Sequence, residues 1–202
     1  MPDWDEDSPE LRQNLTRILE EIVEQAERRE TPTAELARRW QRLCMHALKA
    51  EPRYVGAFRG ERGLERTGVK IGRFRGSPAA RVADELKDFE KVIQTAVAEL
   101  DRNIPVGKKL NPDQLDAVLD LCAWAHAEWV RIHPVANGNG RTARLWGNFI
   151  AVRYGLPPFV RLRPRPHEGY SEAGMKAMQG DWEATAIVFQ RLLGHSLEEF
   201  SE

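Results

Sequence analysis

Apolar residues recur at helical spacing along most of this 202-residue chain. In residues 8–29, for example, leucine, isoleucine and valine fall three or four positions apart, so one face of a helix would carry them all. The same period returns in six later stretches, and segments containing proline, glycine or asparagine separate them. The pattern predicts an all-α fold with helices over residues 8–29, 34–50, 78–102, 111–130, 140–152, 171–179 and 181–193.

Residues 51–78 break this pattern. They contain glycines at positions 56, 60, 63, 68, 72 and 76, with arginines between them. A helix does not survive that density of glycine, because each glycine costs it roughly 1 kcal/mol relative to alanine. The run Gly68-Val69-Lys70-Ile71-Gly72 is the best candidate for a short β-segment, and a plain surface loop is the alternative.

The charge and cysteine content narrow the classes of protein to which this chain can belong. The formal net charge is −1, so no global field favours nucleic acid or a membrane surface as a partner. No apolar run approaches the ~18 residues of a membrane span. The first ten residues are acidic and have no apolar core, so we expect no secretory signal there. Cys44 and Cys122 fall inside apolar helical patterns, which is typical of buried free thiols in a reducing compartment. We therefore expect a cytoplasmic protein that binds neither nucleic acid nor membrane.

The stretch from His133 to Arg144 lies where one predicted helix ends and the next begins, and it reads His-Pro-Val-Ala-Asn-Gly-Asn-Gly-Arg-Thr-Ala-Arg. Its two glycines allow a tight turn and a close approach to a ligand. The first N–H groups of the following helix have no acceptor within that helix, so they favour an anion. Arg141 and Arg144 share a helix face and can bind phosphate oxygens together. These residue types predict a site for nucleotidyl or phosphoryl transfer.

This stretch resembles the signature of the Fic family, His-x-Phe-x-(Asp/Glu)-Gly-Asn-Gly-Arg-x-x-Arg. Two positions depart from it, because Val135 stands in place of the phenylalanine and Asn137 in place of the acidic residue. The resemblance extends weakly over roughly residues 50–195. It implies an all-α fold, a Fic-type helical bundle with a short β-hairpin flap. The matching residues are His133, Gly138, Asn139, Gly140, Arg141 and Arg144.

The resemblance also implies a division of the chain. Residues 1–50 would form an N-terminal helical extension, residues 51–195 a Fic-like catalytic domain, and residues 196–202 a C-terminal tail. In the family a β-hairpin flap precedes the signature, and it aligns the main chain of a target protein as an added strand. The residues that would form this target-docking flap are Gly68, Val69, Lys70 and Ile71.

The activity that the resemblance implies is transfer of AMP from ATP, the co-substrate, to a hydroxyl group of a target protein. His133 would be the general base that takes the proton from a serine, threonine or tyrosine side chain, an effect typically worth ~10²–10⁴ in rate. The N–H groups of residues 138–140 would bind the α-phosphate. Arg141 would bind the β- and γ-phosphates, and Arg144 the γ-phosphate.

Asn137 leaves the chemistry open. The acidic residue usual at this position helps to hold Mg²⁺, which favours negatively charged oxygen ligands, whereas an amide oxygen brings no charge. Removing one unit charge at ~4 Å matters by up to about 4 kcal/mol at an effective dielectric constant near 20. The enzyme would then be slower and rely on the triphosphate to hold Mg²⁺. The alternatives are that the same fold transfers another phosphate-linked group or a phosphoryl group, or that the chain is a nucleotide-binding interaction module with little turnover.

Inhibition is a related question. Many members of the family carry a helix with the motif (Ser/Thr)-x-x-x-Glu-(Gly/Asn), whose glutamate pairs with the second signature arginine, here Arg144. Residues 16–20, 31–35 and 95–99 match the first part of this motif, but none is followed by glycine or asparagine. We therefore expect either no internal inhibitor or a separate inhibitor protein of the antitoxin kind.

Overall fold

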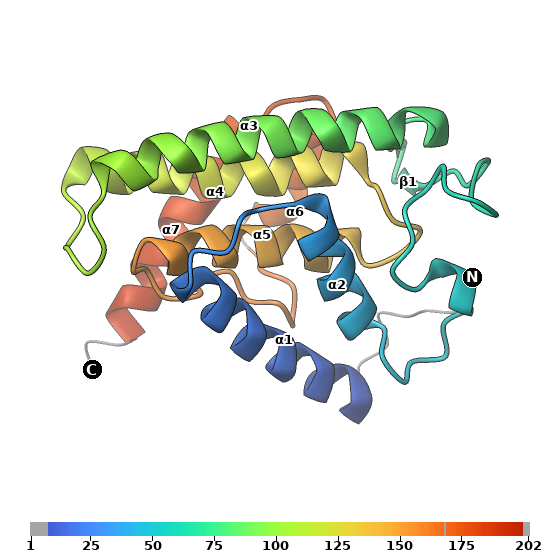
Figure 1. Cartoon of the computed structure of the whole chain (residues 1–202), viewed down its shortest axis with the longest axis horizontal. Coiled ribbons are helices and arrows are strands. Elements are labelled where there is room, and N and C mark those ends of the chain that lie inside the picture. The colour runs from blue at the N-terminus through green and yellow to red at the C-terminus, as the bar shows by residue number, and fades with distance from the viewer. Residues whose placement is uncertain (1–7, 168, 200–202) are drawn as a thin grey trace.

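The computed structural model describes residues 8–167 and 169–199, which form seven α-helices and one two-stranded antiparallel hairpin (Figure 1). The all-α prediction is confirmed. The α-helices are α1 (Pro9–Glu27), α2 (Ala34–Cys44), α3 (Val82–Asn103), α4 (Pro112–Ile132), α5 (Asn139–Arg153), α6 (Tyr170–Ala177) and α7 (Glu183–Glu199). The strands are β1 (Lys70–Ile71) and β2 (Phe74–Arg75), and two short 3₁₀ helices are η1 (Pro52–Tyr54) and η2 (Ala79–Arg81).

The helix α5 lies in the middle of the bundle and packs against both α4 and α1 (Figure 1). The antiparallel partner of α4 is α3, and α4 also contacts α6 and α7. The chain passes from α4 to α5 at one end of the bundle, and the β1–β2 hairpin lies beside that end (Figure 1). This arrangement places the stretch that begins at His133 next to the hairpin.

A cluster of buried aromatic rings joins four of the helices. Trp146 of α5 is at its centre, and its ring centroid lies 4.8 Å from that of Trp40 in α2, 5.3 Å from Phe89 in α3 and 5.9 Å from Trp129 in α4. Phe149, one turn further along α5, is 5.5 Å from Trp40. Because aromatic rings bury large apolar areas and prefer tilted contacts of this kind, the cluster fixes how α2, α3 and α4 sit on α5.

The end of α2 differs from the prediction, because the helix stops at Cys44 rather than near residue 50. Asn14 of α1 donates from Nδ2 to the carbonyl oxygens of Cys44 (3.3 Å) and His46 (2.7 Å). These bonds satisfy carbonyl groups that the end of a helix leaves without partners. Ala47 then has a φ of 58°, a left-handed value that does not continue a helix. A contact from another helix therefore ends α2.

The predicted helix starts agree better with the structure than the predicted ends. Ser8 Oγ accepts the N–H of Leu11 at 3.1 Å and caps α1. Asn111 and Gln114 form a capping box at the start of α4, with bonds of 2.9 and 3.0 Å in the two directions. In contrast, α7 continues to Glu199, past the predicted end at residue 193.

Residues on both sides of position 50 share one apolar core. Ile18 of α1 and Trp40 of α2 belong to the same buried cluster as Phe149 of α5 and Phe189 of α7. Residues 196–199 are part of α7. The shared core means that the three predicted parts, the extension, the catalytic domain and the tail, are not separated by their packing. A division of their functions stays a prediction.

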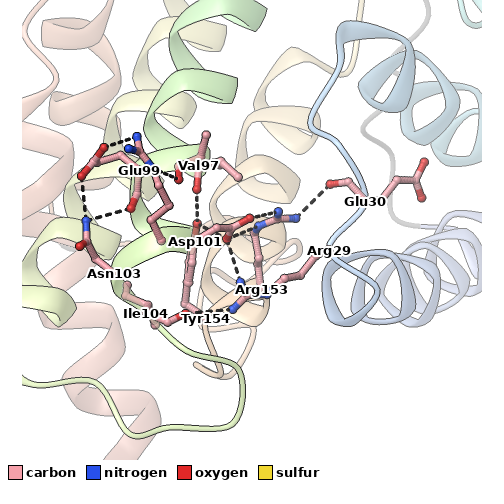
Figure 2. Close-up of polar contacts among 11 residues, drawn as sticks. Arg29, Glu30, Val97, Glu99, Asp101, Asn103, Ile104, Arg153 and Tyr154 are labelled. Atoms are coloured by element: carbon pink, nitrogen blue, oxygen red, sulfur yellow. Dashed lines mark hydrogen bonds and ion pairs between the residues drawn. The ribbon is translucent and has the colours of Figure 1, made fainter.

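An ionic network around Asp101 (Figure 2) lies at the end of the bundle opposite the hairpin (Figure 1). Asp101, near the end of α3, pairs with Arg153 of α5 at 2.6 Å and with Arg29 after α1 at 3.1 Å. It also accepts a hydrogen bond from Tyr154 Oη at 3.0 Å. Arg153 donates in addition to the carbonyl of Glu30 at 3.1 Å. The network therefore ties the ends of α3 and α5 to the link between α1 and α2.

The two cysteines, Cys44 and Cys122, are buried and free, as the sequence indicated. Burial raises the pKa of the Cys122 thiol, so this side chain stays protonated and behaves as a small apolar group. Of the helices in the described ranges, none combines the length and the apolar character needed to cross a membrane.

Candidate active site

The backbone at His133, where α4 ends, is left-handed, with φ 54° and ψ 56°. The N–H of His133 donates to the carbonyl of Trp129 at 3.0 Å, and its Nδ1 lies 3.0 Å from the carbonyl oxygen of Val130. A carbonyl oxygen can only accept, so Nδ1 carries the proton in this contact and Nε2 is left unprotonated. The imidazole therefore presents Nε2 as the atom that can take a proton.

The imidazole of His133 is neutral at physiological pH, because its pKa is lowered from 6.5 to about 4. Burial is the main cause, the Val130 carbonyl acts in the opposite direction, and the positive charge of Arg59 lowers the pKa further. A general base has to be unprotonated before it can accept a proton. His133 meets that requirement across the physiological range.

A second histidine of α4, His126, lies in the core and not in the site. It is 1% exposed, and its Nε2 is 2.6 Å from the hydroxyl oxygen of Tyr170. Burial, and after it the positive charge of Arg144, lowers the pKa of His126 from 6.5 to about 3.

Lowering the pH below 6.5 should destabilise the fold through His126. Between the unfolded pKa of 6.5 and the folded pKa of about 3, the unfolded chain binds a proton that the folded protein does not bind. This contribution to stability is complete above pH 6.5, and each pH unit below it removes about 1.4 kcal/mol from the free energy of unfolding. Urea unfolding at pH 7 and pH 5 measures the loss.

The variant His126→Gln, which has no titrating group at this position, provides the comparison for that measurement. It should lose less stability between the two pH values than the unmodified chain loses. An equal loss in both proteins would show that His126 does not titrate with folding.

Asn139 fixes the shape of the loop between α4 and α5. Its Oδ1 accepts the N–H of Val135 at 3.0 Å, and its Nδ2 donates to the carbonyl of the same residue at 2.7 Å. The side chain is thus engaged within the loop, and a contact from Asn139 to a nucleotide would come from its backbone N–H. Gly138 precedes α5 with a φ of 90°, and a Cβ there would lie 2.9 Å from Met45 Cε. The left-handed backbone conformation favours glycine at this position, whereas the Met45 methyl group is the end of a flexible side chain and could shift.

Arg141 and Arg144 are both buried in the first turns of α5, with exposed fractions of 3% and 6%. Arg141 Nη2 lies 3.4 Å from Asn137 Oδ1. Arg144 donates to the carbonyl of Leu162 at 2.9 Å and contacts the Tyr170 hydroxyl at 3.4 Å. Among the residues that the structure describes, no carboxylate forms an ion pair with Arg144. A buried guanidinium with neutral partners favours an anionic ligand.

Asn137 does not lie in a preformed cluster of acidic, histidine or cysteine ligands in the described part of the chain. Within residues 8–167 and 169–199, no group of three or more histidine, cysteine, aspartate or glutamate side chains is placed to hold a metal ion. Asn137 offers one amide oxygen, and that oxygen faces the cationic Arg141. Mg²⁺ prefers carboxylate and phosphate oxygens. A metal role for Asn137 stays a prediction.

The predicted β-segment forms one strand of a hairpin, in which Lys70 pairs with Arg75 and Ile71 with Phe74. Gly68 and Val69 precede the strand, and the Val69 carbonyl accepts the N–H of Gly76 at 3.2 Å. The surface-loop alternative is therefore wrong for residues 70 and 71. Docking of a target on this hairpin stays a prediction.

Gly76 follows the hairpin and lies against His133. A Cβ added at Gly76 would lie 2.6 Å from the Cβ of His133, a distance that real side chains do not adopt. The absence of a side chain at position 76 therefore allows the chain leaving β2 to pass directly beside the proposed base.

Two residues that support the site were not identified from the sequence. Gln41 of α2 donates to the carbonyl of Asn137 at 3.2 Å and accepts the N–H of Gly56 at 2.5 Å. Arg59 is 1% exposed and donates from Nε to the carbonyl of His133 at 2.7 Å. In the sequence, Gln41 is one polar residue in an amphipathic helix and Arg59 is one of several arginines among glycines. No spacing within the sequence distinguishes either of them.

None of the partial matches to an inhibitory motif reaches Arg144 within the described part of the chain. Glu20 is exposed, Glu35 pairs with Arg38, and Glu99 pairs with Arg102. The expectation of no internal inhibitor, or of a separate inhibitor protein, stays a prediction.

The region around this site is similar to known proteins. The sequence model of the Fic/DOC family matches residues 31–151. The protein adenylyltransferase Fic of Nematostella vectensis is 41% identical over 63 residues, which are 31% of this chain and 14% of that protein. Protein adenylyltransferase fic-1 of Caenorhabditis elegans is 32% identical over 97 residues, 48% of this chain and 16% of that protein. The chain thus spans only a small part of these relatives.

Solved structures share the fold over most of the chain. A Fic domain containing signaling protein from Bacteroides thetaiotaomicron has a TM-score of 0.66 and 21% identity, over 94% of this chain and 69% of that chain. The N-terminal Fic domain of a Bartonella effector protein has a TM-score of 0.57 and 14% identity, over 91% of this chain and 80% of that chain. At such low identities the likeness shows the fold alone.

Proposed function

This chain belongs to the Fic/DOC family, and on that premise we propose that it transfers AMP from ATP to a hydroxyl side chain of a target protein. The observation that carries the proposal is that a neutral histidine and a buried arginine lie on either side of the loop between α4 and α5. His133 is neutral, with Nε2 left to accept a proton, and Arg144 is a buried cation whose described partners are a carbonyl and a hydroxyl. A base and an anion site are the two parts that this transfer requires.

In the proposed reaction the hydroxyl oxygen of the target attacks the α-phosphorus of ATP. His133 Nε2 takes the proton from that hydroxyl. The bond between the α-phosphorus and the oxygen that bridges to the β-phosphate breaks, and pyrophosphate leaves with the electron pair. No covalent intermediate with the enzyme forms, so a single base is sufficient.

The start of α5 would bind the phosphates in this proposal. The N–H groups of residues 138–140 would bind the α-phosphate, because the first N–H groups of a helix have no acceptor within it. Arg141 and Arg144 would bind the β- and γ-phosphates. Each charge-assisted hydrogen bond contributes roughly 1.5–3 kcal/mol. Mg²⁺ would arrive with the triphosphate, whose oxygens are better ligands than the amide of Asn137.

The hairpin would bind the target in this proposal. Its two strands form a sheet of their own, so each has an outer edge that an extended peptide can pair with. Gly76, next in the chain, lies beside His133, so a peptide bound along Gly68, Val69, Lys70 and Ile71 would pass close to the base. The partner would be a protein with an accessible serine, threonine or tyrosine. A separate inhibitor protein is a second proposed partner.

The test uses ATP labelled at either the α- or the γ-phosphate, incubated with the chain and a protein lysate. Label from the α-phosphate that appears on protein, and that is lost in His133→Ala, is the expected result. Label from the γ-phosphate alone would replace the proposal with phosphoryl transfer by the same fold. ATP binding without labelling would replace it with a nucleotide-dependent interaction module, which the amide at Asn137 makes the main alternative of another class.

The variant Asn137→Asp should raise the Mg²⁺-dependent rate, because it restores a negative charge where the family carries one. We expect a gain of about tenfold, or ~1.4 kcal/mol, within the Coulomb limit of about 4 kcal/mol for a unit charge at ~4 Å. The rate is measured against Mg²⁺ concentration. Asn111→Asp, which adds the same charge at the far end of α4 and keeps a good helix cap, is the matched control. An unchanged rate in Asn137→Asp would show that the metal does not depend on this position.

A further inference from the structure

Arg59 is a buried cation, and within the described residues its side chain donates hydrogen bonds to carbonyl oxygens alone. Its guanidinium donates from Nε to the carbonyl of His133 (2.7 Å) and from Nη2 to that of Ile132 (2.9 Å). Nη1 donates to the carbonyls of Ser77 (2.8 Å) and Thr67 (3.2 Å). Four carbonyl groups from two separate parts of the chain therefore converge on one side chain.

These contacts complete the end of α4. The last carbonyl groups of a helix accept no hydrogen bond from within it, and here His133, Arg59 and the backbone N–H of Ser77 contact three of them. The Trp129 carbonyl accepts the N–H of His133, the Val130 carbonyl contacts its Nδ1, and the Ile132 carbonyl accepts from Arg59. A cation at the C-terminal end of a helix also interacts favourably with the helix dipole.

The backbone around Arg59 is bound to the same segment. The N–H of Arg59 donates to the carbonyl of Pro134 at 2.7 Å, and Phe58 forms an antiparallel bridge with Val135. Arg59 therefore forms hydrogen bonds to the carbonyl groups of His133 and of both its neighbours. Its side chain donates to residues 132 and 133, and its backbone N–H donates to residue 134. These bonds hold the backbone from which the imidazole reaches the Val130 carbonyl.

We infer that Arg59 is a positioning residue for the proposed base: it holds His133 in the left-handed conformation that keeps Nδ1 on the Val130 carbonyl and leaves Nε2 to accept the proton. The inference rests on the proposed function, which makes His133 the base. Arg59 acts through His133 and touches neither nucleotide nor target in this assignment.

The planar fork of an arginine suits this role. Its five N–H donors point in fixed directions and reach several carbonyl oxygens at once, whereas the ammonium group of a lysine is a single point. The positive charge of Arg59 adds to the burial that keeps His133 unprotonated. A neutral replacement removes both the fork and the charge.

The test compares Arg59→Gln with Arg38→Gln. Arg38 anchors the same segment of chain, because it pairs with Glu61 at 2.5 Å and donates to the Gly56 carbonyl at 3.1 Å. In the described part of the chain its hydrogen bonds and ion pairs do not reach residues 132–134. Loosening the segment alone would therefore affect both variants. An effect on His133 through its own carbonyl would affect only Arg59→Gln.

The first measurement does not depend on activity. Nitrogen NMR of the histidine rings across pH reports which ring nitrogen of His133 carries the proton and the pKa of the ring, with His133→Asn identifying its signals. The unmodified chain and Arg38→Gln should show Nδ1 protonated and a pKa near 4. In Arg59→Gln the two tautomers should mix and the pKa should move towards 6.5. Spectra of Arg59→Gln that match the unmodified chain would overturn the inference.

The second measurement is the rate of transfer. Arg59→Gln should lower kcat by about 10- to 100-fold, because misplacing a catalytic group by ~1 Å can cost that much, and it should leave KM for ATP unchanged. A rise in KM without a fall in kcat would place Arg59 in nucleotide binding and contradict the inference. If the unmodified chain transfers no AMP but the NMR changes appear, the proposed function fails while the positioning of His133 by Arg59 stands.

Arg59→Lys is the second variant, for the case in which Arg59→Gln does not fold. Lysine keeps the positive charge but lacks the planar set of N–H donors of the guanidinium. The tautomers of His133 should mix in this variant too, while the pKa should remain closer to that of the unmodified chain. An unaltered Nδ1-protonated ring in Arg59→Lys would show that the fork does not position the imidazole.

Discussion

Replacing His133 by alanine should lower the rate of AMP transfer by about 10²–10⁴, with ATP binding unchanged. The physical reason is that the imidazole is held with Nε2 unprotonated and that burial keeps it so at neutral pH. The phosphates in the proposed complex are bound by α5, which the substitution does not touch. The rate is measured with ATP labelled at the α-phosphate, and the binding by calorimetry.

Two further variants separate the loss of the base from damage to the backbone. Position 133 is left-handed, a conformation that asparagine tolerates better than alanine. His133→Asn should therefore be as inactive as His133→Ala if the imidazole is the base. His46→Ala removes an exposed histidine and should keep full activity. An active His133→Asn would mean that position 133 matters for its backbone and not for proton transfer.

The second large effect is expected for the fold. Trp40→Ala should lower the free energy of unfolding by about 3–5 kcal/mol, the range typical of removing a buried aromatic side chain. Trp40 has no exposed surface, packs on Trp146 and Phe149, and donates from Nε1 to Gln25 Oε1 at 2.9 Å. The substitution leaves a cavity between α1, α2 and α5 and a buried oxygen without its donor.

Urea unfolding measures this loss, with Trp124→Ala as the matched control. Trp124 is only partly buried and stacks on Phe89 with ring centroids 5.4 Å apart, so its removal should cost less. Equal losses in the two variants would contradict the central place of Trp40 in the core. Because Gln41, the next residue, binds the carbonyl of Asn137, Trp40→Ala should also loosen the loop before α5.

The sequence determined the parts of this protein that depend on local order. Apolar residues at a period near 3.6 produce amphipathic helices whatever their partners are, so the seven α-helices of the described chain could be placed before their packing was known. The capping box at Asn111 and Gln114 is also local, since its partners are three residues apart. The signature from His133 to Arg144 falls at the junction of α4 and α5, where the sequence had located it.

Only the tertiary structure decided which polar groups meet. Arg59 and His133 are 74 residues apart in the chain, and Asn14 ends α2 from 30 residues away. The carbonyl that Arg144 binds belongs to Leu162, in a segment without regular structure. A buried donor has to find an acceptor somewhere, but its choice depends on how the helices pack and not on the residues beside it. For that reason the loop that carries the proposed chemistry could be read from the sequence, and the side chains that hold it in place could not.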